Sequence, residues 1–315
     1  MKLYLAPLQG LTDRIFRAAY TQHIGVFDKT FSPFIRVQGG EYYRPSQCND
    51  ILPIHNTHQQ PVPQFLGNDV ESFQRFEALC TEQGYTEANI NMGCPFPNVM
   101  GKRMGAGILN QPELVEQFLE GVFANTKLKV SVKCRLGKED ASDFEKLIPI
   151  FNNFPLFEMI IHPRIGKQQY KGEANREAFL NYAAQIKHPI CYNGDILTIE
   201  DFTTIKTLAP QVESVMIGRG ILQNPFLLGE LRGEILSIEE KKNRLHKFHT
   251  EMISLCKLKY SGDLGMLKRL EEFWSYHYMT FENGRKVYKA VKKSNNMEKY
   301  ETAVFGAIAD MDNDQ

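Results

Sequence analysis

Polar residues capable of binding or catalysis stand near the ends of short apolar segments through the first 220 or so residues. They are Gln9, Gln64, Asn91 and Cys94, Lys133 and Arg135, His162 and Arg164, Asn193 to Asp195, and Gly218 to Gly220. If the apolar segments are parallel strands, their carboxyl ends lie at one end of a barrel, where these side chains would converge. Any one of them could serve structure alone, but their recurrence after nearly every segment indicates an active site.

Lys133 lies inside the otherwise apolar segment 128–134. It shares one face with Lys129, Ser131 and Arg135, because side chains alternate along a strand. An ammonium group inside a barrel is costly unless it meets an anion or an electron-rich ring. We therefore expect Lys133 to contact a ligand. The alternative is a buried ion pair with a neighbouring carboxylate.

Cys94 follows an apolar segment and precedes a loop rich in glycine and cations. That loop contains Gly101, Lys102, Arg103, Gly105 and Gly107. A thiol in such a loop can act as a nucleophile or a proton donor, and we expect the nearby cations to lower its pKa. The alternative is that Cys94 is only a small buried apolar residue, which is our expectation for the other five cysteines. With no Cys-x-x-Cys pair among them, the cysteines are typical of a reducing compartment, so we expect a cytoplasmic protein.

Glycines follow the last two apolar segments, in Asn193-Gly194-Asp195 and Gly218-Arg219-Gly220. Glycine lets backbone N–H groups approach an anion closely, and barrels bind phosphate with these two loops. Arg219 adds a bidentate donor. The pattern favours a phosphate-bearing ligand, although such loops also occur merely as turns. His162 could be a base or a phosphate contact, but no further ligand stands at metal-binding spacing, so we expect no metal.

The elements that must position these residues alternate between strand and helix. Eight apolar segments of strand length cover residues 3–6, 26–31, 62–66, 88–91, 128–134, 157–162, 189–192 and 214–217. Such alternation predicts βαβ units, and eight of them predict an α/β fold, the TIM (β/α)8 barrel. After about residue 240 only helical periodicity continues. We therefore predict a barrel over residues 1–238, followed by a small C-terminal helical domain over residues 239–315.

The composition is that of an ordinary globular protein. With 315 residues, 43% hydrophobic and 23% charged, it excludes disordered, collagen-like and coiled-coil classes. No apolar run approaches the roughly 18–20 residues of a membrane helix, so we expect no membrane association. The net charge is zero, yet residues 241–300 carry 14 basic and 6 acidic side chains. That excess of cations is large enough to meet a polyanion.

Lysines recur three and four residues apart near the C-terminus. On a helix, Lys286, Lys289 and Lys293 would form one stripe, with Arg285 and Lys292 beside it. A stripe of this kind suits contacts to RNA phosphates, which position the nucleic acid without reading its sequence. The alternative is a solvated lysine face with no partner.

Together these motifs resemble the tRNA-dihydrouridine synthase family. Its active-site signature is similar to Asn89-Ile90-Asn91-Met92-Gly93-Cys94-Pro95 followed by Gly105-Ala106-Gly107. The resemblance continues in order through Ala6-Pro7-Leu8, Gln64-Phe65-Leu66-Gly67, Val132-Lys133-Cys134-Arg135, His162-Pro163-Arg164, Asn193-Gly194-Asp195 and Gly218-Arg219-Gly220. It implies an FMN-bearing barrel and a helical tRNA-binding domain. The implied reaction reduces the C5=C6 bond of a D-loop uridine, with NADPH recharging the flavin.

Carried over position by position, the resemblance implies a set of site residues. The FMN contacts would be Pro7, Leu8, Gln9, Gln64, Lys133, His162, Asn193, Gly194, Asp195, Gly218 and Arg219. Cys94 would be the proton donor, with Asn91 and Arg135 contacting the uridine or the tRNA. Further tRNA contacts would come from Arg36, Lys102, Arg103, Lys286, Lys289 and Lys292. Arg36 resembles a position of the bacterial subgroup that acts at uridine 16, whereas Leu8, Pro163 and Glu271-Glu272 depart from the usual pattern. We expect a monomer.

Three other functions compete with this interpretation. An FMN-dependent barrel dehydrogenase for a free pyrimidine, similar to dihydroorotate dehydrogenase, would share the lysine and the phosphate loops but would not need the cationic helices. A barrel isomerase or aldolase could use Lys133 as a Schiff base. A non-catalytic RNA-binding protein could keep the barrel without the chemistry. Turnover without RNA would identify the dehydrogenase, and borohydride trapping of Lys133 would identify the isomerase or aldolase. A Cys94 substitution that changes nothing in the RNA would identify the non-catalytic protein.

Overall fold

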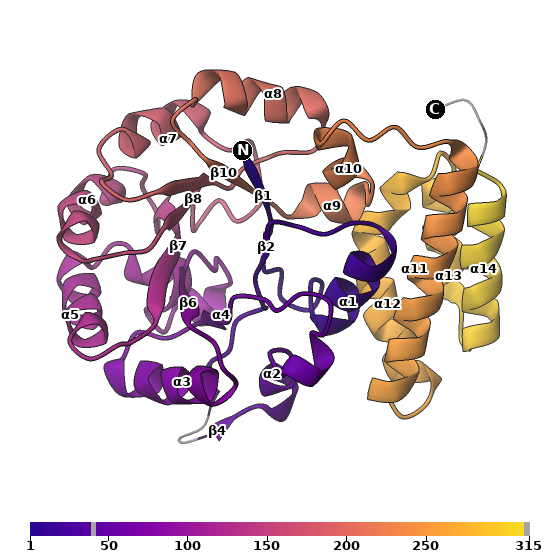
Figure 1. Cartoon of the computed structure of the whole chain (residues 1–315), viewed down its shortest axis with the longest axis horizontal. Helices are drawn as coiled ribbons and strands as arrows, with labels where there is room; N and C mark the ends of the chain where they lie inside the picture. The colour runs from indigo at the N-terminus through magenta and orange to yellow at the C-terminus, as the bar shows by residue number, and fades with distance from the viewer. Residues whose placement is uncertain (39–41, 312–315) are drawn as a thin grey trace.

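Eight parallel strands form the barrel of the computed structural model, which describes residues 1–38 and 42–311. The strands are β1 (Lys2–Leu5), β2 (Lys29–Thr30), β5 (Gln64–Phe65), β6 (Glu87–Met92), β7 (Lys129–Gly137), β8 (Met159–Ile165), β9 (Ile190–Tyr192) and β10 (Ser214–Ile217). They hydrogen-bond in the order β2-β1-β10-β9-β8-β7-β6-β5. Backbone bridges from Phe31 to Val62 and from Ile35 to Phe65 join the two ends of that order. The predicted TIM barrel is confirmed (Figure 1), and each predicted segment overlaps one strand.

Strand lengths differ from the sequence prediction at three places. β7 continues to Gly137 and β8 to Ile165, so both strands extend beyond the predicted segments, and Arg164 lies within β8. The predicted segment 26–31 keeps only the two residues of β2. The long connection to β5 contains a hairpin that the sequence did not reveal, with β3 (Val37–Gln38) antiparallel to β4 (Tyr42–Tyr43).

Helices surround the strands (Figure 1). The longer ones are α1 (Arg14–His23), α3 (Val70–Glu82), α5 (Pro112–Phe123), α6 (Asp143–Asn153), α7 (Arg176–Ala183) and α8 (Ile199–Leu208). Short turns of helix occupy the connections as α2 (Pro45–Cys48), η1 (Pro53–His55), α4 (Pro97–Met100), η2 (Gly105–Ile108), α9 (Arg219–Gln223) and α10 (Leu227–Leu231).

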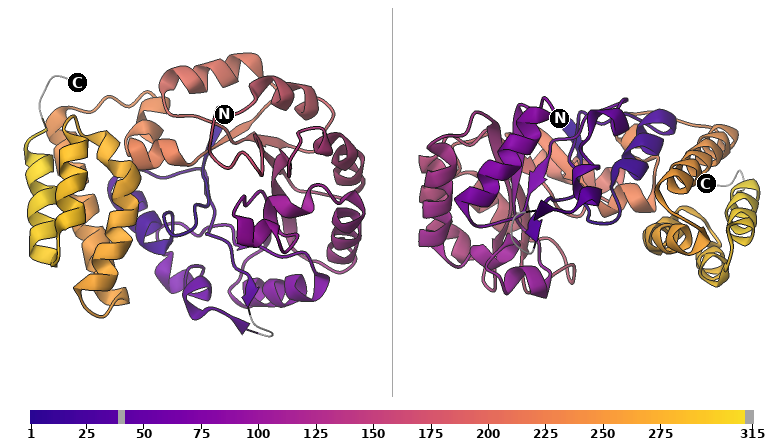
Figure 2. Two further views of the ribbon diagram at one scale, coloured as in Figure 1. Left: turned by 180° about the vertical axis from the view of Figure 1, so that it is seen from behind. Right: turned by 90° about the horizontal axis from the view of Figure 1, so that it is seen from below.

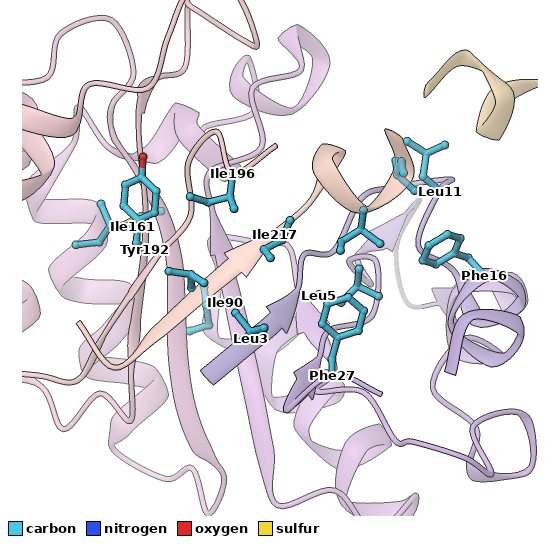
Figure 3. Close-up of a cluster of buried hydrophobic side chains, with 14 of the residues drawn as sticks. Leu3, Leu5, Leu11, Phe16, Phe27, Ile90, Ile161, Tyr192, Ile196 and Ile217 are labelled. Carbon is cyan, nitrogen blue, oxygen red and sulfur yellow. The ribbon is translucent and has the colours of Figure 1, made fainter. Parts of the chain in front are cut away.

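The core has an outer and an inner part because side chains alternate along each strand. Leu3 and Leu5 point outward into the large cluster between strands and helices, which also contains Ile90 and Ile217 (Figure 3). Tyr4, between the two leucines, belongs to a separate inner cluster. The barrel interior is therefore filled with side chains, and space for a ligand exists only at its ends.

Four helices complete the chain: α11 (Ile238–Lys259), α12 (Asp263–His277), α13 (Gly284–Lys293) and α14 (Met297–Ala309), with the short turn η3 (Tyr278–Thr280) before α13. They lie at one flank of the barrel (Figure 2). Within residues 239–311 the structure contains no strand. The helical C-terminal region is therefore confirmed. Helix α11 begins at Ile238, and the predicted division into two domains at residue 238 stays a prediction.

Helices α1 and α11 join the two regions. The ring of Phe16 on α1 packs against Phe248 on α11 and Phe273 on α12, with centroids 5.9 Å apart in both pairs. Beside these rings, the buried Asp13 accepts hydrogen bonds from Arg269, the shorter of 2.8 Å, and contacts Lys259 at 3.3 Å. Burial alone would raise the pKa of Asp13, but the charge of Arg269 and its hydrogen bonds hold that pKa below its usual range. The appended helices are thus fixed by a shared apolar core and a buried ion pair.

We predict that Arg269→Met destabilises the fold by about 3–5 kcal/mol, because a buried carboxylate is then deprived of its main partner. Since the folded-state pKa of Asp13 is lowered, the contribution of the pair is present at neutral pH and is lost as pH falls below the unfolded value of about 4. Urea unfolding at pH 7 measures the destabilisation, and the difference between the two proteins should shrink in acid. The control is Arg75→Met, which breaks the exposed pair with Glu71 and should cost less than about 1 kcal/mol. Equal destabilisation of the two variants would contradict the prediction.

Candidate active site

A cavity of about 270 Å³ opens at the carboxyl ends of the barrel strands. Its walls include Pro7, Leu8, Gln9, Asn91, Cys94, Lys133, Arg135, His162, Asn193, Gly194, Asp195, Gly218 and Arg219. They include every predicted cofactor contact except Gln64, the predicted proton donor Cys94, and the predicted substrate contacts Asn91 and Arg135. A larger cavity of about 370 Å³ lies between α13 and α14, but its described lining contains no cysteine, histidine or arginine. The chemistry therefore points to the smaller cavity.

Gln64 lies below the floor of this cavity, where it is fully buried. Its amide N–H donates to Asn89 Oδ1 at 2.7 Å, and its oxygen accepts from Asn91 Nδ2 at 2.8 Å. Asn89 in turn donates to Ser131 Oγ at 2.9 Å. Because both ends of the Gln64 side chain are occupied, the structure assigns it a supporting position under Asn91, and its predicted contact with a cofactor stays a prediction.

Asn91 fixes the loop that carries Cys94. Its side-chain oxygen accepts the backbone N–H groups of Gly93 and Cys94 at 3.0 and 2.9 Å. On the other side, Gly105 has a positive φ of 58°, and a Cβ at that position would lie 2.8 Å from Cys94 Cβ. Glycine is therefore required for this close approach, which explains the spacing between Cys94 and the following glycines.

The Cys94 thiol is 6% exposed at the cavity wall. Burial raises its pKa, and although a backbone hydrogen bond and the charges of Arg135, Arg36 and Lys133 oppose this effect, they do not overcome it. The sequence expectation that nearby cations lower this pKa is therefore wrong in its net direction, because burial is the larger effect. A thiol with a raised pKa is protonated at neutral pH and is suited to donate a proton rather than to act as a thiolate nucleophile.

The Lys133 side chain reaches the cavity from β7. Among the described residues, no carboxylate lies within ion-pair distance of its ammonium group, so the alternative of a buried ion pair finds no partner there. Burial and, second, the charge of Arg135 lower the pKa of Lys133 to about 8. An anionic ligand or an electron-rich ring would stabilise such a partly desolvated cation, which has no described counter-ion.

Backbone carbonyls accept hydrogen bonds from Nε and Nη1 of Arg135. Its Nε donates to Gly93 at 3.0 Å, and its Nη1 donates to Ile165 and Gln169 at 2.9 and 2.6 Å. The guanidinium also lies 5.3 Å from the ring centroid of Tyr170. Arg135 thus clamps the Cys94 loop to the loop after β8, and its predicted contact with RNA stays a prediction.

Asp195 joins two arginines behind the glycine loops. Its carboxylate accepts two hydrogen bonds from Arg164, at 3.0 and 2.6 Å, and one from Arg219 at 2.6 Å. Burial would raise the pKa of Asp195, but the hydrogen bonds and charges of these arginines lower it. Asp195 therefore orients Arg219 at the cavity, while the loop glycines Gly194 and Gly218 supply the space beside it.

His162 is neutral in this arrangement. Burial, followed by the charges of Arg135 and Lys133, holds its pKa well below the usual value. Arg164 Nη1 lies 3.0 Å from His162 Nε2, and because a guanidinium can only donate, the proton of the imidazole is on Nδ1. No cluster of three or more His, Cys, Asp or Glu side chains that could hold a metal occurs in the part of the chain that the structure describes.

The structure adds wall residues that the sequence did not indicate. Tyr170, in the loop after β8, lies between Arg135 and Arg219, with its ring centroid 5.0 Å from the guanidinium carbon of Arg219. Helix α12 contributes Glu272, Ser275 and Tyr276. Polar residues spaced three and four apart, opposite the buried Phe273 of the same helix, were the available signal for this face.

The predicted RNA contacts fall into two groups. Lys102 and Arg103 are exposed in the loop after Cys94, and Arg36 is half-buried near the same thiol. Lys286, Lys289 and Lys292 are on α13, and only Lys286 borders a cavity, the one between α13 and α14. On the same helix, Val291 is buried. One cationic group therefore lies on segments close to Cys94 in sequence or in electrostatic effect, and the other lies on a separate helix.

Solved structures show a similar fold. A variant of NCR from Zymomonas mobilis has a TM-score of 0.50 and 15% identity, covering 74% of this chain and 86% of its own. A mutant morphinone reductase in complex with tetrahydroNAD also has a TM-score of 0.50, with 10% identity, and covers 73% of this chain and 86% of its own. Among the described residues, no helix is long and apolar enough to cross a membrane.

Sequence relatives cover the chain more fully. A tRNA-dihydrouridine(16) synthase from Neisseria meningitidis (serogroup A) is 24% identical over 303 residues, which is 92% of this chain and 90% of the relative. A probable tRNA-dihydrouridine synthase 2 from Bacillus subtilis is 30% identical over 232 residues, covering 70% of this chain and 69% of the relative. The family model for dihydrouridine synthase matches residues 4–310. With the signature loop, the glycines and the barrel all in place, the chain belongs to the dihydrouridine synthase family.

Proposed function

We propose that this protein reduces the C5=C6 bond of a uridine in the D-loop of tRNA to give dihydrouridine. Family membership supports the reaction, and relatives that are tRNA-dihydrouridine(16) synthases support uridine 16 as the target. The observation that carries the proposal is the protonated Cys94 thiol, held at the wall of a cavity that also receives Lys133. A tRNA substrate agrees with the expected cytoplasmic location, and a monomer remains our expectation.

We further propose that the cavity binds FMN, with NADPH as the reductant. Lys133 offers an ammonium group without a described counter-ion, and Arg219 stands beside Gly194 and Gly218. A Cβ on Gly218 would lie 3.3 Å from Ala6 Cβ and would occupy space between the loops after β1 and β10. We assign the contacts with FMN to Pro7–Gln9, Lys133, His162, Asn193–Gly194, Gly218 and Arg219. When bound, FMN supplies the hydride that C6 of uracil accepts, and NADPH restores it.

Cys94 gives the proton that C5 requires once charge develops on the conjugated C4 carbonyl. Its raised pKa keeps the proton available at neutral pH. After donation the thiolate is close to Arg135, Arg36 and Lys133, whose charges stabilise it. Asn91 and Arg135 hold the loop in place through the backbone of Gly93 and Cys94, so that the thiol does not have to be ordered when the uridine arrives.

The base must leave the RNA stack to reach this cavity, because the thiol is buried at its wall. The exposed cations Lys102 and Arg103 at the rim, and Lys286, Lys289 and Lys292 on α13, are suited to phosphate contacts. We propose that the barrel carries the chemistry and that residues after 238 position the tRNA.

Mapping dihydrouridine in tRNA tests the function directly. We expect tRNA from a deletion strain to lack dihydrouridine at position 16 and to regain it when the gene is restored. Purified protein should reduce uridine in tRNA and leave free uracil and orotate unchanged. Turnover of the free pyrimidine without RNA would instead support the dehydrogenase alternative.

For the proton donor, we predict that Cys94→Ala still binds FMN and tRNA and still oxidises NADPH when it is first mixed with the reductant. Only the step that forms dihydrouridine should slow, by the roughly 10²–10⁴-fold typical of losing a positioned general acid. Single-turnover kinetics separates the two steps. Cys134→Ala is the control, because that cysteine is fully buried behind the strand and should affect stability rather than turnover. Full activity of Cys94→Ala would show that another residue is the donor.

For Lys133, we predict that Lys133→Met stabilises the protein without flavin but weakens its binding of FMN. The folded-state pKa lies below the unfolded value, so the charged form is disfavoured at pH 7 and the Met variant of the apoprotein should melt at a higher temperature. FMN should nevertheless bind it more weakly. In the wild type, FMN affinity should fall as pH rises through about 8, because the ammonium loses its proton, and this dependence should be absent in the variant.

Lys129→Met is the matched control for Lys133→Met. It removes a lysine from the same strand, but Lys129 is exposed at the far end of β7 and should change neither melting nor FMN affinity. Fluorescence titrations with FMN between pH 6 and pH 9.5 would test both variants. Identical pH profiles for the wild type and Lys133→Met would refute the proposed contact.

For α13, we predict that changing Lys286, Lys289, Lys292 and Lys293 to Ala weakens tRNA binding and flattens its salt dependence. The slope of log affinity against log salt should fall by about 0.7–0.9 for each phosphate that the variant no longer neutralises. The charge-matched control changes Lys127, Lys146, Lys187 and Lys206, on and beside the barrel helices, to Ala. If the two quadruple variants had equal slopes, the α13 lysines would be a solvated face with no partner, and Lys102 and Arg103 would remain as the RNA contacts.

A further inference from the structure

A large aromatic side chain stands exposed at the rim of the active-site cavity. Phe96 lies two residues after Cys94 and lines the same cavity, yet 51% of it is accessible to solvent, against 6% for Cys94. The chain thus passes from the buried thiol to an exposed ring within two residues. Leaving a phenyl ring in water forgoes the stabilisation that burial would give, so its exposure calls for an explanation.

The backbone of Phe96 is held in place by its neighbours. Proline precedes and follows it, which restricts the backbone on both sides. Its carbonyl oxygen accepts the N–H groups of Val99 and Met100, both at 2.9 Å, and opens α4. Val99 is buried beside Cys94, so this turn is anchored to the floor of the site. The ring is therefore presented at the rim by a rigid segment.

Exposed cations follow the ring on the same loop. Lys102 and Arg103 are exposed at the end of the same loop, and Arg36 lies close enough to influence the thiol. Arg103 adopts a positive φ of 56°, which is uncommon for a residue other than glycine, while Asn68 donates to the carbonyls of Lys102 and Arg103 at 3.2 Å. An exposed aromatic ring among cations is the combination with which proteins bind unstacked nucleic acid, where rings stack on bases and cations meet phosphates.

We propose that Phe96 stacks on the nucleobase next to the uridine that enters the cavity. This inference rests on the proposed function, in which the target base leaves the RNA stack. Extraction exposes a face of the adjacent base, and a rigid ring at the rim can cover that face and offset part of the cost of unstacking. The ring stacks on the neighbour rather than on the target, because a uridine that reaches the buried thiol lies deeper than the half-exposed ring. Phe96 is thus a positioning residue for the RNA.

The test is a double-mutant cycle between the ring and the neighbouring base. The wild type and Phe96→Ala, Phe96→Leu and Phe96→Tyr are titrated with a tRNA transcript, and with two transcripts in which the nucleotide on the 5′ or the 3′ side of the target uridine is abasic. On intact tRNA, Phe96→Ala should weaken binding by roughly 5- to 150-fold, the range for one stacked base. Phe96→Tyr should keep most of the affinity, and Phe96→Leu should fall between them. On one of the abasic transcripts the difference between wild type and Phe96→Ala should vanish.

The matched control is Phe157→Ala. Phe157 is also a half-exposed phenylalanine near two lysines, Lys29 and Lys129, but it lies at the opposite end of the barrel. It should bind both kinds of transcript like the wild type, and the melting temperature and flavin content of each variant show that it is folded. Wild-type affinity of Phe96→Ala, a weakening that persists on both abasic transcripts, or an equal weakening in Phe157→Ala would overturn the inference. Failure of the wild type to form dihydrouridine would instead overturn the proposed function.

Discussion

A chain of hydrogen-bonded amides inside the barrel is the constraint on which the active site depends. It runs from Ser131 on β7 through Asn89 on β6 and Gln64 on β5 to Asn91, whose oxygen holds the backbone of Cys94. Each amide uses both its donor and its acceptor, so removing any member would leave buried polar groups without partners. The register of three strands is thereby coupled to the position of one thiol. The positions of the side chains at this end of the barrel therefore depend on polar groups below the cavity as well as on those that line it.

At the cavity, burial and hydrogen-bond acceptors oppose the positive charge of the basic side chains. Four basic side chains converge there, from Lys133, Arg135, His162 and Arg219, and burial lowers the pKa of Lys133 to about 8 and that of His162 well below its usual value. Asp195 neutralises Arg164 and Arg219, and backbone carbonyls occupy Arg135. Among the described residues, Lys133 has neither a counter-ion nor a side-chain hydrogen bond. The site is consequently suited to a ligand with negative charge, and in the proposed reaction the same cations would stabilise the thiolate of Cys94.

The appended helices belong to the active-site wall as well as to the cationic flank. Helix α12 packs its apolar side on α1 through Phe273 and presents Glu272, Ser275 and Tyr276 to the cavity on its polar side. The buried pair between Asp13 and Arg269 fixes this arrangement one helical turn away. An amphipathic helix that docks on the barrel therefore closes one wall of the pocket. The barrel and the helical part share one continuous hydrophobic core. The proposed division of tasks between them therefore lies within a single packed structure.

The sequence by itself determined the eight strands, the later helices and the set of polar residues at the strand ends, because periodicity and signature spacing are local properties of the chain. It also placed Cys94, Lys133 and the glycine loops in one site. Only the tertiary structure decided that Gln64 lies beneath the floor, that Tyr170 and α12 form walls, and that burial outweighs the cations in setting the pKa of Cys94. The physical reason is that burial and the choice of hydrogen-bond partner arise from segments far apart in sequence, whose approach no local pattern records.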